Sequence, residues 1–282
     1  MVGTSRKKPA VVWTVAGFDP SSGAGITADL MTFAAHGLFG CSAVTALTVQ
    51  STAGVRGTEL ARREQLRQTL HCLLEDLPPA GLKIGMLGGR AIAGVVGAFL
   101  RTLRDTGLQC PVVLDPVLRS SSGRMLYPAE GVDLLHELIF PHVDWITPNW
   151  SELEILAGLP VRDLQQVEKA ARTLQQRHPE LGVLVTGGDQ QRPVEVLVRR
   201  GVSAVFLEGE RVETTSTHGT GCAFSSALLS RLVLGEEIEA AARGAKAYVA
   251  GALRHAPGLG AGKGPMDLLW PCLLYTSPSP RD

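Results

Sequence analysis

The stretch from Ala10 to His36, AVVWTVAGFDPSSGAGITADLMTFAAH, contains the pattern that decides the fold. Its first six residues, Ala10–Val15, are mostly β-branched or apolar and predict a buried strand. A loop of glycine, serine and proline follows, and the apolar periodicity from about Gly25 to His36 predicts a helix. A strand that runs through a glycine-rich loop into a helix is typical of α/β proteins.

The same alternation continues along the chain. Further strands are predicted at 42–49, 82–86, 112–114, 143–146 and 183–185, and further helices at 62–76, 91–105, 129–139, 163–177, 220–234 and 237–254. Short alternating runs between Val194 and Val212 predict an antiparallel hairpin at a sheet edge. We therefore expect an α/β fold with a central, mostly parallel β-sheet flanked by helices on both faces. No repeat or linker divides the chain, so we expect one domain over residues 1–270.

The composition excludes several classes of protein. Hydrophobic residues make up 45% of the 282, which is ample for one large core, and Lys plus Arg equals Asp plus Glu at 27 each. A balanced charge offers no basic field for nucleic acid or anionic lipid. The five cysteines never occur as C-x-x-C, which predicts a reducing, cytoplasmic location rather than a disulfide framework. The uncharged stretch 30–55 is too polar to span a membrane.

The segment Ser216–Ala223, STHGTGCA, is the strongest candidate for chemistry. Two glycines and small residues open a predicted helix, and the backbone N–H groups of such a turn can hold an anion. This arrangement suits the charge that develops on a transferred phosphoryl group. Cys222 lies in the first turn, where the pKa of a thiol tends to fall. The alternative is a buried, inert cysteine.

Carboxylates and an amide follow two other predicted strands. Asn149 and Glu152 are three residues apart at the start of a helix, so both can face one point where a hydrated Mg²⁺ would bind. Asp115, at the end of the strand 112–114, adds another carboxylate. The alternative for the first two is an N-terminal capping box, with Asn149 as cap and Glu152 as its partner. The two roles are compatible.

Three other glycine-rich segments give weaker signals. Thr186–Asp189 follows a strand and offers N–H groups for nucleotide phosphates, although many turns contain Gly-Gly. Gly23–Ala28 matches the dinucleotide-binding pattern G-x-G-x-x-A, but seven residues separate it from Val15, and no acid follows at the distance needed to bind the ribose. Gly258–Gly264 ends in Gly-Lys-Gly but has neither the first glycine nor the final Ser or Thr of a P-loop.

Seven segments together resemble one family. In order they are AGFDPSSGAGITADL (16–30), TVQST (48–52), KIGML (83–87), LDPV (114–117), TPNWSE (147–152), VTGGD (185–189) and THGTGCAF (217–224). They resemble the hydroxymethylpyrimidine/phosphomethylpyrimidine kinases of thiamine biosynthesis, which belong to the ribokinase-like superfamily. The resemblance covers about 11–269. It implies a ribokinase-like fold and use of ATP and Mg²⁺ to phosphorylate 4-amino-5-hydroxymethyl-2-methylpyrimidine, and then its monophosphate. Relatives commonly form homodimers.

The resemblance also implies roles for individual residues. Those expected at the pyrimidine are Gln50, Met86, Asp29 and Gly17. Those expected at the reacting phosphoryl group are Gly219, Gly221 and Cys222, with Cys222 as the base. Those expected at the nucleotide are Thr186, Gly188 and Gly219. Those expected at Mg²⁺ are Glu152, Asn149 and Asp115. Two alternatives stay open: Gln50 as an ordinary polar residue at a strand end, and Asp29 as an exposed helical residue.

The chain departs from the family at Thr186, where relatives often have a lysine that binds phosphate. Two other functions stay open. Pyridoxal kinase performs the same chemistry on another hydroxymethyl heterocycle, and a nucleotide- or vitamer-binding module would lack turnover. The tail 271–282 has three prolines and no helical or strand period. We hypothesise that this tail is disordered and is not native family sequence.

Overall fold

The computed structural model describes residues 8–120, 123–128, 131–187 and 193–273. These residues form a nine-stranded sheet in the order β3-β2-β1-β4-β5-β6-β7-β8-β9. The parallel strands are β1 (Val11–Phe18), β2 (Phe39–Ser51), β4 (Gly81–Ile84), β5 (Val112–Leu114), β6 (Trp145–Ile146) and β7 (Gly182–Val185). Antiparallel strands complete both edges: β3 (Gly54–Leu60) beside β2, and β8 (Glu195–Val198) and β9 (Val205–Leu207) beyond β7.

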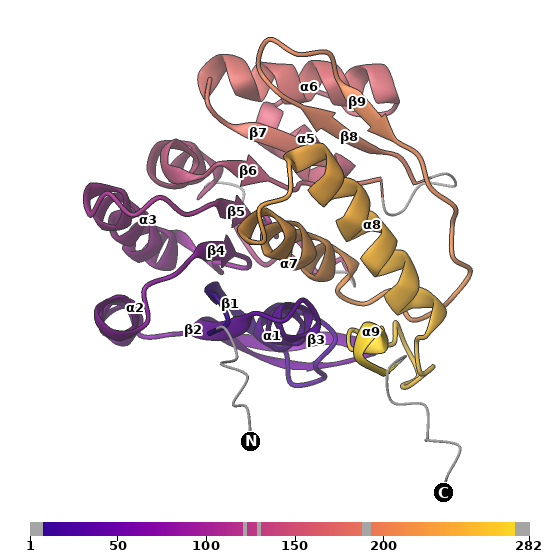
Figure 1. Ribbon diagram of the computed structural model, residues 1–282, viewed down its shortest axis with the longest axis horizontal. Coiled ribbons are helices and arrows are strands. Elements are labelled where there is room, and N and C mark those ends of the chain that lie inside the picture. The colour runs from indigo at the N-terminus through magenta and orange to yellow at the C-terminus, as the bar shows by residue number, and fades with distance from the viewer. Residues whose placement is uncertain (1–7, 121–122, 129–130, 188–192, 274–282) are drawn as a thin grey trace, which may run out of the picture.

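Helices cover both faces of the sheet (Figure 1). One face is covered by α2 (Arg63–Asp76), α3 (Arg90–Asp105), α5 (Trp150–Ala157) and α6 (Leu164–Arg177). The opposite face is covered by α1 (Gly25–Ala35), α7 (Thr220–Val233) and α8 (Ile238–Arg254). This three-layer α/β arrangement confirms the predicted fold class.

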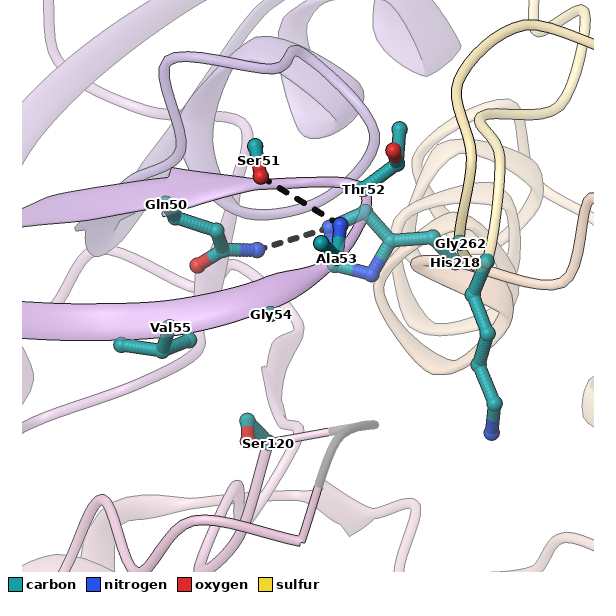
Figure 2. A pocket seen from close by; sticks show the side chains of 10 residues that line it. Gln50, Ser51, Thr52, Ala53, Gly54, Val55, Ser120, His218 and Gly262 are labelled. Atoms are coloured by element: carbon teal, nitrogen blue, oxygen red, sulfur yellow. Dashed lines mark hydrogen bonds between the residues drawn. The ribbon is translucent and has the colours of Figure 1, made fainter.

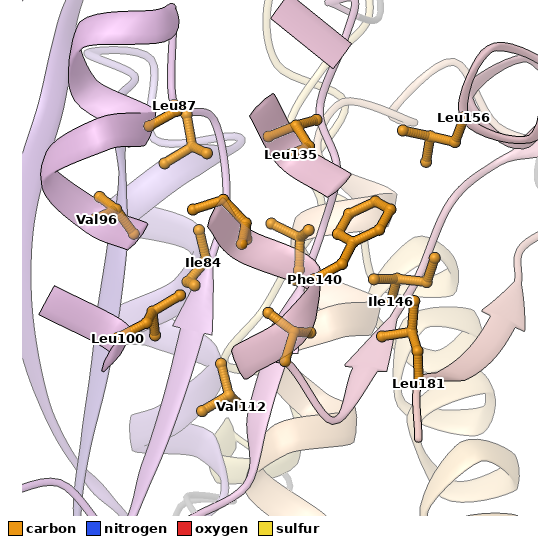
Figure 3. Close-up of a cluster of buried hydrophobic side chains, with 14 of the residues drawn as sticks. Ile84, Leu87, Val96, Leu100, Val112, Leu135, Phe140, Ile146, Leu156 and Leu181 are labelled. Atoms are coloured by element: carbon orange, nitrogen blue, oxygen red, sulfur yellow. The ribbon is translucent and has the colours of Figure 1, made fainter. Parts of the chain in front are cut away.

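The central strands are buried on both faces, so each face has its own hydrophobic core. In β5, Val112 and Leu114 pack on the side of α3, whereas Val113 packs on the side of α7. Figure 3 shows the first core, where Ile84 of β4 lies near Leu100 and Val96 of α3. Side chains that alternate between two buried faces explain why these strands read as continuous apolar runs.

The predicted antiparallel hairpin between Val194 and Val212 is confirmed by β8 and β9. Strand β3 was missed, because its sequence GVRGTEL contains two glycines and no apolar alternation. It forms by antiparallel pairing with β2, which extends to Ser51 and so supplies a template at the edge of the sheet. No helix in the described ranges is both long and apolar enough to cross a membrane.

One other prediction needs correction. The helix predicted at 129–139 is a short helix α4 (Val132–Leu134), a π-helix η2 (Leu135–Ile139) and a 3-10 turn η3 (Phe140–His142). Near the C-terminus, a helical turn, α9 (Trp270–Leu273), includes the first three residues of the tail 271–282, whose origin and disorder stay predictions. The Trp270 ring holds this turn in place, because it stacks on His255 and donates a hydrogen bond to the Tyr248 carbonyl. Residues 274–282, the remainder of that tail, lie outside the described residues.

Candidate active site

The candidate site lies at the carboxyl ends of the parallel strands, where open α/β sheets bind their ligands. Gly17 is the second-to-last residue of β1, and Gln50 is near the end of β2. Met86 follows β4, and Asp115 follows β5. The chain after β6 leads into α5, and α7 begins nearby at Thr220. Residues from the whole sequence therefore meet at one edge of the sheet.

Helix α7 begins in a tight glycine turn. Gly219 is its N-cap residue, with φ +80°, a left-handed conformation that favours glycine. A Cβ at Gly219 would lie 1.9 Å from the Gly23 carbonyl oxygen, so this turn is pressed against the loop that enters α1. Within the described residues, α7 has no side-chain cap and no acidic residue in its first turn. Its first N–H groups are thus suited to an anion.

Cys222 differs from the prediction in one respect. Burial, with the nearby carboxylates of Asp115 and Asp29, raises the pKa of its thiol to about 12, although Lys83 and the Gly25 backbone act in the opposite direction. The expected fall in this pKa at a helix N-terminus is therefore wrong. The thiol is neutral at physiological pH, so Cys222 does not begin a reaction as a thiolate.

Asp115 and Glu152 are two buried carboxylates that lie close enough to influence each other's ionisation. Burial raises the pKa of Glu152 to about 8, and the Asp115 carboxylate adds to the effect. Burial likewise raises the pKa of Asp115, against the influence of Lys83. A Cβ at Gly221 would lie 3.8 Å from both Asp115 carboxylate oxygens, so Asp115 borders the turn.

These two carboxylates fit Mg²⁺. They are buried and incompletely neutralised, and Mg²⁺ in kinases is commonly held by one or two carboxylates together with phosphates and water. No cluster of three or more His, Cys, Asp or Glu with metal-binding geometry occurs in the described ranges. The remaining ligands would therefore have to come from nucleotide and water.

Asn149 is committed to the start of α5. Its side-chain oxygen accepts from the Glu152 backbone N–H at 3.0 Å and from the Ser151 hydroxyl at 2.7 Å. In return the Glu152 carboxylate accepts from the Asn149 N–H at 2.9 Å, which completes a capping box. The capping alternative is confirmed. The second oxygen of Glu152 accepts a longer hydrogen bond, from the Leu118 N–H at 3.4 Å, whereas the oxygen of Asn149 is occupied by the cap.

Gln50 reaches the same turn from β2. Its amide nitrogen lies 2.8 Å from Nε2 of His218 (Figure 2). The same ring nitrogen lies 2.7 Å from the Asp19 carboxylate. One ring nitrogen cannot donate to Asp19 and accept from Gln50 at once. The charged carboxylate is the stronger acceptor, so the Gln50 amide can exchange this contact for one to a ligand.

Asp19 also shapes the loop after β1. Burial alone would raise its pKa, but hydrogen bonds from His218 and Ser21 hold the pKa below its ordinary value. Its carboxylate accepts from the Ser21 hydroxyl at 2.7 Å and from the Ala24 N–H at 3.0 Å. An ionised Asp19 therefore fixes the loop that contacts Gly219.

A cavity of about 170 Å³ opens beside Gln50. It is lined by Gln50, the turn 51–54, Val55, Ser120, His218, Gly262 and Lys263. The segment that superficially resembles a P-loop supplies one wall, because a Cβ at Gly262 would lie 2.1 Å from the Thr52 carbonyl oxygen. This segment packs on the β2–β3 turn and is not the start of a helix.

Gly17 and Met86 come together at the ends of β1 and β4. A Cβ at Gly17 would lie 3.1 Å from the Met86 sulfur, so glycine makes room for this side chain. The Thr45 hydroxyl donates to the Met86 carbonyl at 2.5 Å and fixes the backbone there. Met86 is 8% exposed, and its contact with a substrate ring stays a prediction.

Asp29 lies in the interior and not on an exposed helix face, so that alternative is wrong. Its carboxylate accepts from Lys83, Thr14 and Ser226, and its exposed fraction is 0%. A direct contact with substrate would have to replace one of these bonds. Thr186 is half-buried and pairs with Asn149 in an isolated bridge. Gly188, the other predicted nucleotide residue, lies outside the described residues.

Three residues of the site were not singled out from the sequence: Asp19, His218 and Lys83. Signals for them were present. Lys83 is a lysine inside the apolar strand GLKI, a position where a charge requires a buried partner. Asp19 and His218 flank glycine-rich turns, but only the fold shows that residues 199 apart form a hydrogen bond.

Comparison with known proteins agrees with this geometry. The family model described as phosphomethylpyrimidine kinase matches residues 19–267. A hydroxymethylpyrimidine/phosphomethylpyrimidine kinase of Synechococcus elongatus is 35% identical over 263 residues, which cover 93% of this chain and 98% of that protein. The protein of that name from Bacillus subtilis is 36% identical, over 90% of this chain and 93% of its own.

Solved structures show the same fold. An ADP complex of Bacillus subtilis pyridoxal kinase has a TM-score of 0.83 and 28% identity, covering 94% of this chain and 100% of its own. A phosphomethylpyrimidine kinase from Clostridium difficile has a TM-score of 0.73 and 32% identity, covering 85% and 97% of the two chains. The likeness therefore extends over nearly the whole length of each protein.

Proposed function

Since the chain belongs to the phosphomethylpyrimidine kinase family, we propose that it uses ATP to phosphorylate 4-amino-5-hydroxymethyl-2-methylpyrimidine, and then the resulting monophosphate. The observation that carries this proposal is the position of the uncapped N-terminus of α7. Asp115 borders this turn at Gly221, Glu152 lies close enough to Asp115 for that carboxylate to raise its pKa, and Gln50 contacts His218, directly before the turn. A phosphoryl group at that turn would be close to both a cation and an acceptor alcohol.

The N–H groups of Gly221 and Cys222 would stabilise the charge on the transferred phosphoryl oxygens. The Cys222 thiol is neutral and hydrogen-bonds the Asp115 carboxylate. Its sulfur can therefore accept the hydroxyl proton of the substrate only while it passes its own proton to that carboxylate. Proton transfer of this kind leaves no thiolate in the resting enzyme and needs no low thiol pKa.

Asp115 and Glu152 would hold Mg²⁺, which when bound neutralises charge on the nucleotide phosphates. The Gln50 amide offers both a donor and an acceptor to the edge of a pyrimidine ring. Met86 would contact the ring face through its polarisable sulfur. Thr186 and Gly188 would contact nucleotide, with backbone groups in place of the lysine charge found in many relatives.

The test is turnover of ATP with the pyrimidine alcohol, followed by the same assay with its monophosphate. We expect ADP to form with both acceptors. If neither acceptor led to ADP formation, the proposal would be refuted. Turnover of the alcohol but not of the monophosphate would refute the second step. A Gln50→Ala variant should raise the KM for the pyrimidine more than the KM for ATP.

Pyridoxal is the second candidate acceptor, and one observation favours it: several solved pyridoxal kinases, such as that of Bacillus subtilis, have high TM-scores against this chain. The ratio of kcat/KM for the two alcohols decides between them, and we expect the pyrimidine to be preferred. A cytoplasmic location, a homodimer and a single domain over 1–270 stay predictions.

A further inference from the structure

Helices α1 and α7 are joined at two levels, one turn apart. At the first level the Gly25 backbone lies close enough to the Cys222 thiol to act against its raised pKa. Four residues further along each helix, the Ser226 hydroxyl donates to the Asp29 carboxylate at 2.8 Å. Because residues four apart lie on one face of a helix, these contacts are successive rungs between the two helices.

The contact between Ser226 and Asp29 is supported by a buried charge from the sheet. Lys83 of β4 donates from Nζ to both Asp29 oxygens at 2.8 Å, and both side chains are fully buried. The Thr14 hydroxyl of β1 donates to the same carboxylate at 2.5 Å. A single carboxylate thus connects two strands of the sheet to α1 and α7.

The local structure makes room for this lysine. A Cβ at Gly85 would lie 3.0 Å from Lys83 Nζ, so glycine two residues further on accommodates the ammonium group. Burial alone would lower the pKa of Lys83, but the carboxylates of Asp29 and Asp115 raise it above its ordinary value. Lys83 therefore remains charged in the interior.

A buried ion pair is weak evidence for stability, because desolvation offsets most of the attraction. Replacing such a pair with apolar residues is often neutral or stabilising. The feature that needs an explanation is its position, one helical turn behind Cys222 and in contact with both helices that form the candidate site.

We propose that Lys83 and Asp29 are positioning residues for phosphoryl transfer, which act by fixing the N-terminal turn of α7 relative to that of α1. The pair does not touch the reacting atoms. It acts through Ser226, which fixes the position of the first turn of α7, with Cys222, relative to the loop that enters α1. This inference rests on the proposed kinase function.

Ser226→Ala removes the hydrogen bond from Ser226 to Asp29 and leaves the Lys83–Asp29 ion pair intact. It therefore tests positioning without leaving an unpaired charge. Small errors in the placement of reacting groups cost up to about 100-fold in rate. We expect Ser226→Ala to lower kcat about 10-fold while both KM values change less than about twofold. Ser226→Thr keeps the hydroxyl and should restore most of the rate.

Ser230 gives a matched control. It is also a buried serine of α7, one turn further on, but its hydroxyl donates to the Ser226 carbonyl within the same helix. Ser230→Ala should leave kcat unchanged. An equal loss of kcat in Ser226→Ala and Ser230→Ala would overturn the proposal, because it would show only that α7 had been loosened.

The double variant Lys83→Met/Asp29→Asn removes both charges together, so neither is left unpaired in the interior. We expect it to fold, as judged by thermal unfolding, and to lose about 100-fold in kcat with both KM values little changed. A kcat within twofold of wild type in this variant and in Ser226→Ala would overturn the proposal. Absence of turnover in wild type would instead refute the proposed function, and this inference with it.

Discussion

Glu152 gives a prediction whose size follows from the structure. The residue is 7% exposed, and burial with the nearby Asp115 raises the pKa of its carboxyl group from 4.5 to about 8. Between these values the folded protein binds one proton more at Glu152 than the unfolded chain does. The metal-free protein must therefore lose stability as pH rises through that interval.

Each pH unit of this interval is worth about 1.4 kcal/mol. From 4.5 to about 8 the total is about 5 kcal/mol, and the part between pH 5 and 8 is about 4 kcal/mol. Glu152→Gln stays neutral at every pH, and its side-chain oxygen can still accept from the Asn149 N–H. The variant should lack this loss and be the more stable protein at pH 8.

The assay is urea unfolding at pH 5 and at pH 8 in the presence of EDTA, for wild type and Glu152→Gln. Glu154→Gln is the matched control on the same helix. Glu154 is paired with Arg162, which lowers its pKa, so it stays ionised from pH 5 to 8. Parallel loss of stability in wild type and Glu152→Gln would refute the reasoning, because the extra proton would then not be on Glu152.

Three further predictions concern other parts of the molecule. Gly219→Ala should lower kcat at least 10-fold in steady-state assays, since its Cβ would meet the Gly23 carbonyl at 1.9 Å; unchanged kcat would show that the turn is not part of the site. Burial lowers the pKa of His178 to about 4, so the wild type should lose stability as pH falls from 6.5 towards 4, and His178→Gln should reduce that loss in urea unfolding. Cys222, with a thiol pKa of about 12, should react with iodoacetamide more slowly at pH 8 than the exposed Cys72, as measured by mass spectrometry; faster reaction would contradict the raised pKa.

Periodicity predicted the elements whose burial follows a regular pattern. The buried strand at 112–114 and the amphipathic helices near 91–105 and 163–177 fall within a residue or so of their observed bounds. It failed where pairing partners decide the structure. Strand β3 has little strand character of its own and depends on β2, and the π-helix η2 lies where a regular helix is predicted.

The sequence predicted which loops form the candidate site better than it predicted the contacts between their side chains. The sequence places Gly219–Cys222, Asp115 and Gln50 after strands or before a helix, and strand order then brings them to one edge. It does not show that Lys83 neutralises Asp29, or that the carboxylate of Asp115 acts against a low thiol pKa in Cys222. Those outcomes depend on burial and on contacts between segments far apart in the chain.

The contact between Gly219 and Gly23 has a consequence for protein engineering. Two backbones meet there with no space for a side chain, so random mutagenesis of either loop should yield mostly inactive clones. Gln50 and Met86 stand on separate strand ends, outside that contact. A library intended to change the acceptor alcohol should therefore vary these two positions and keep both glycine turns constant.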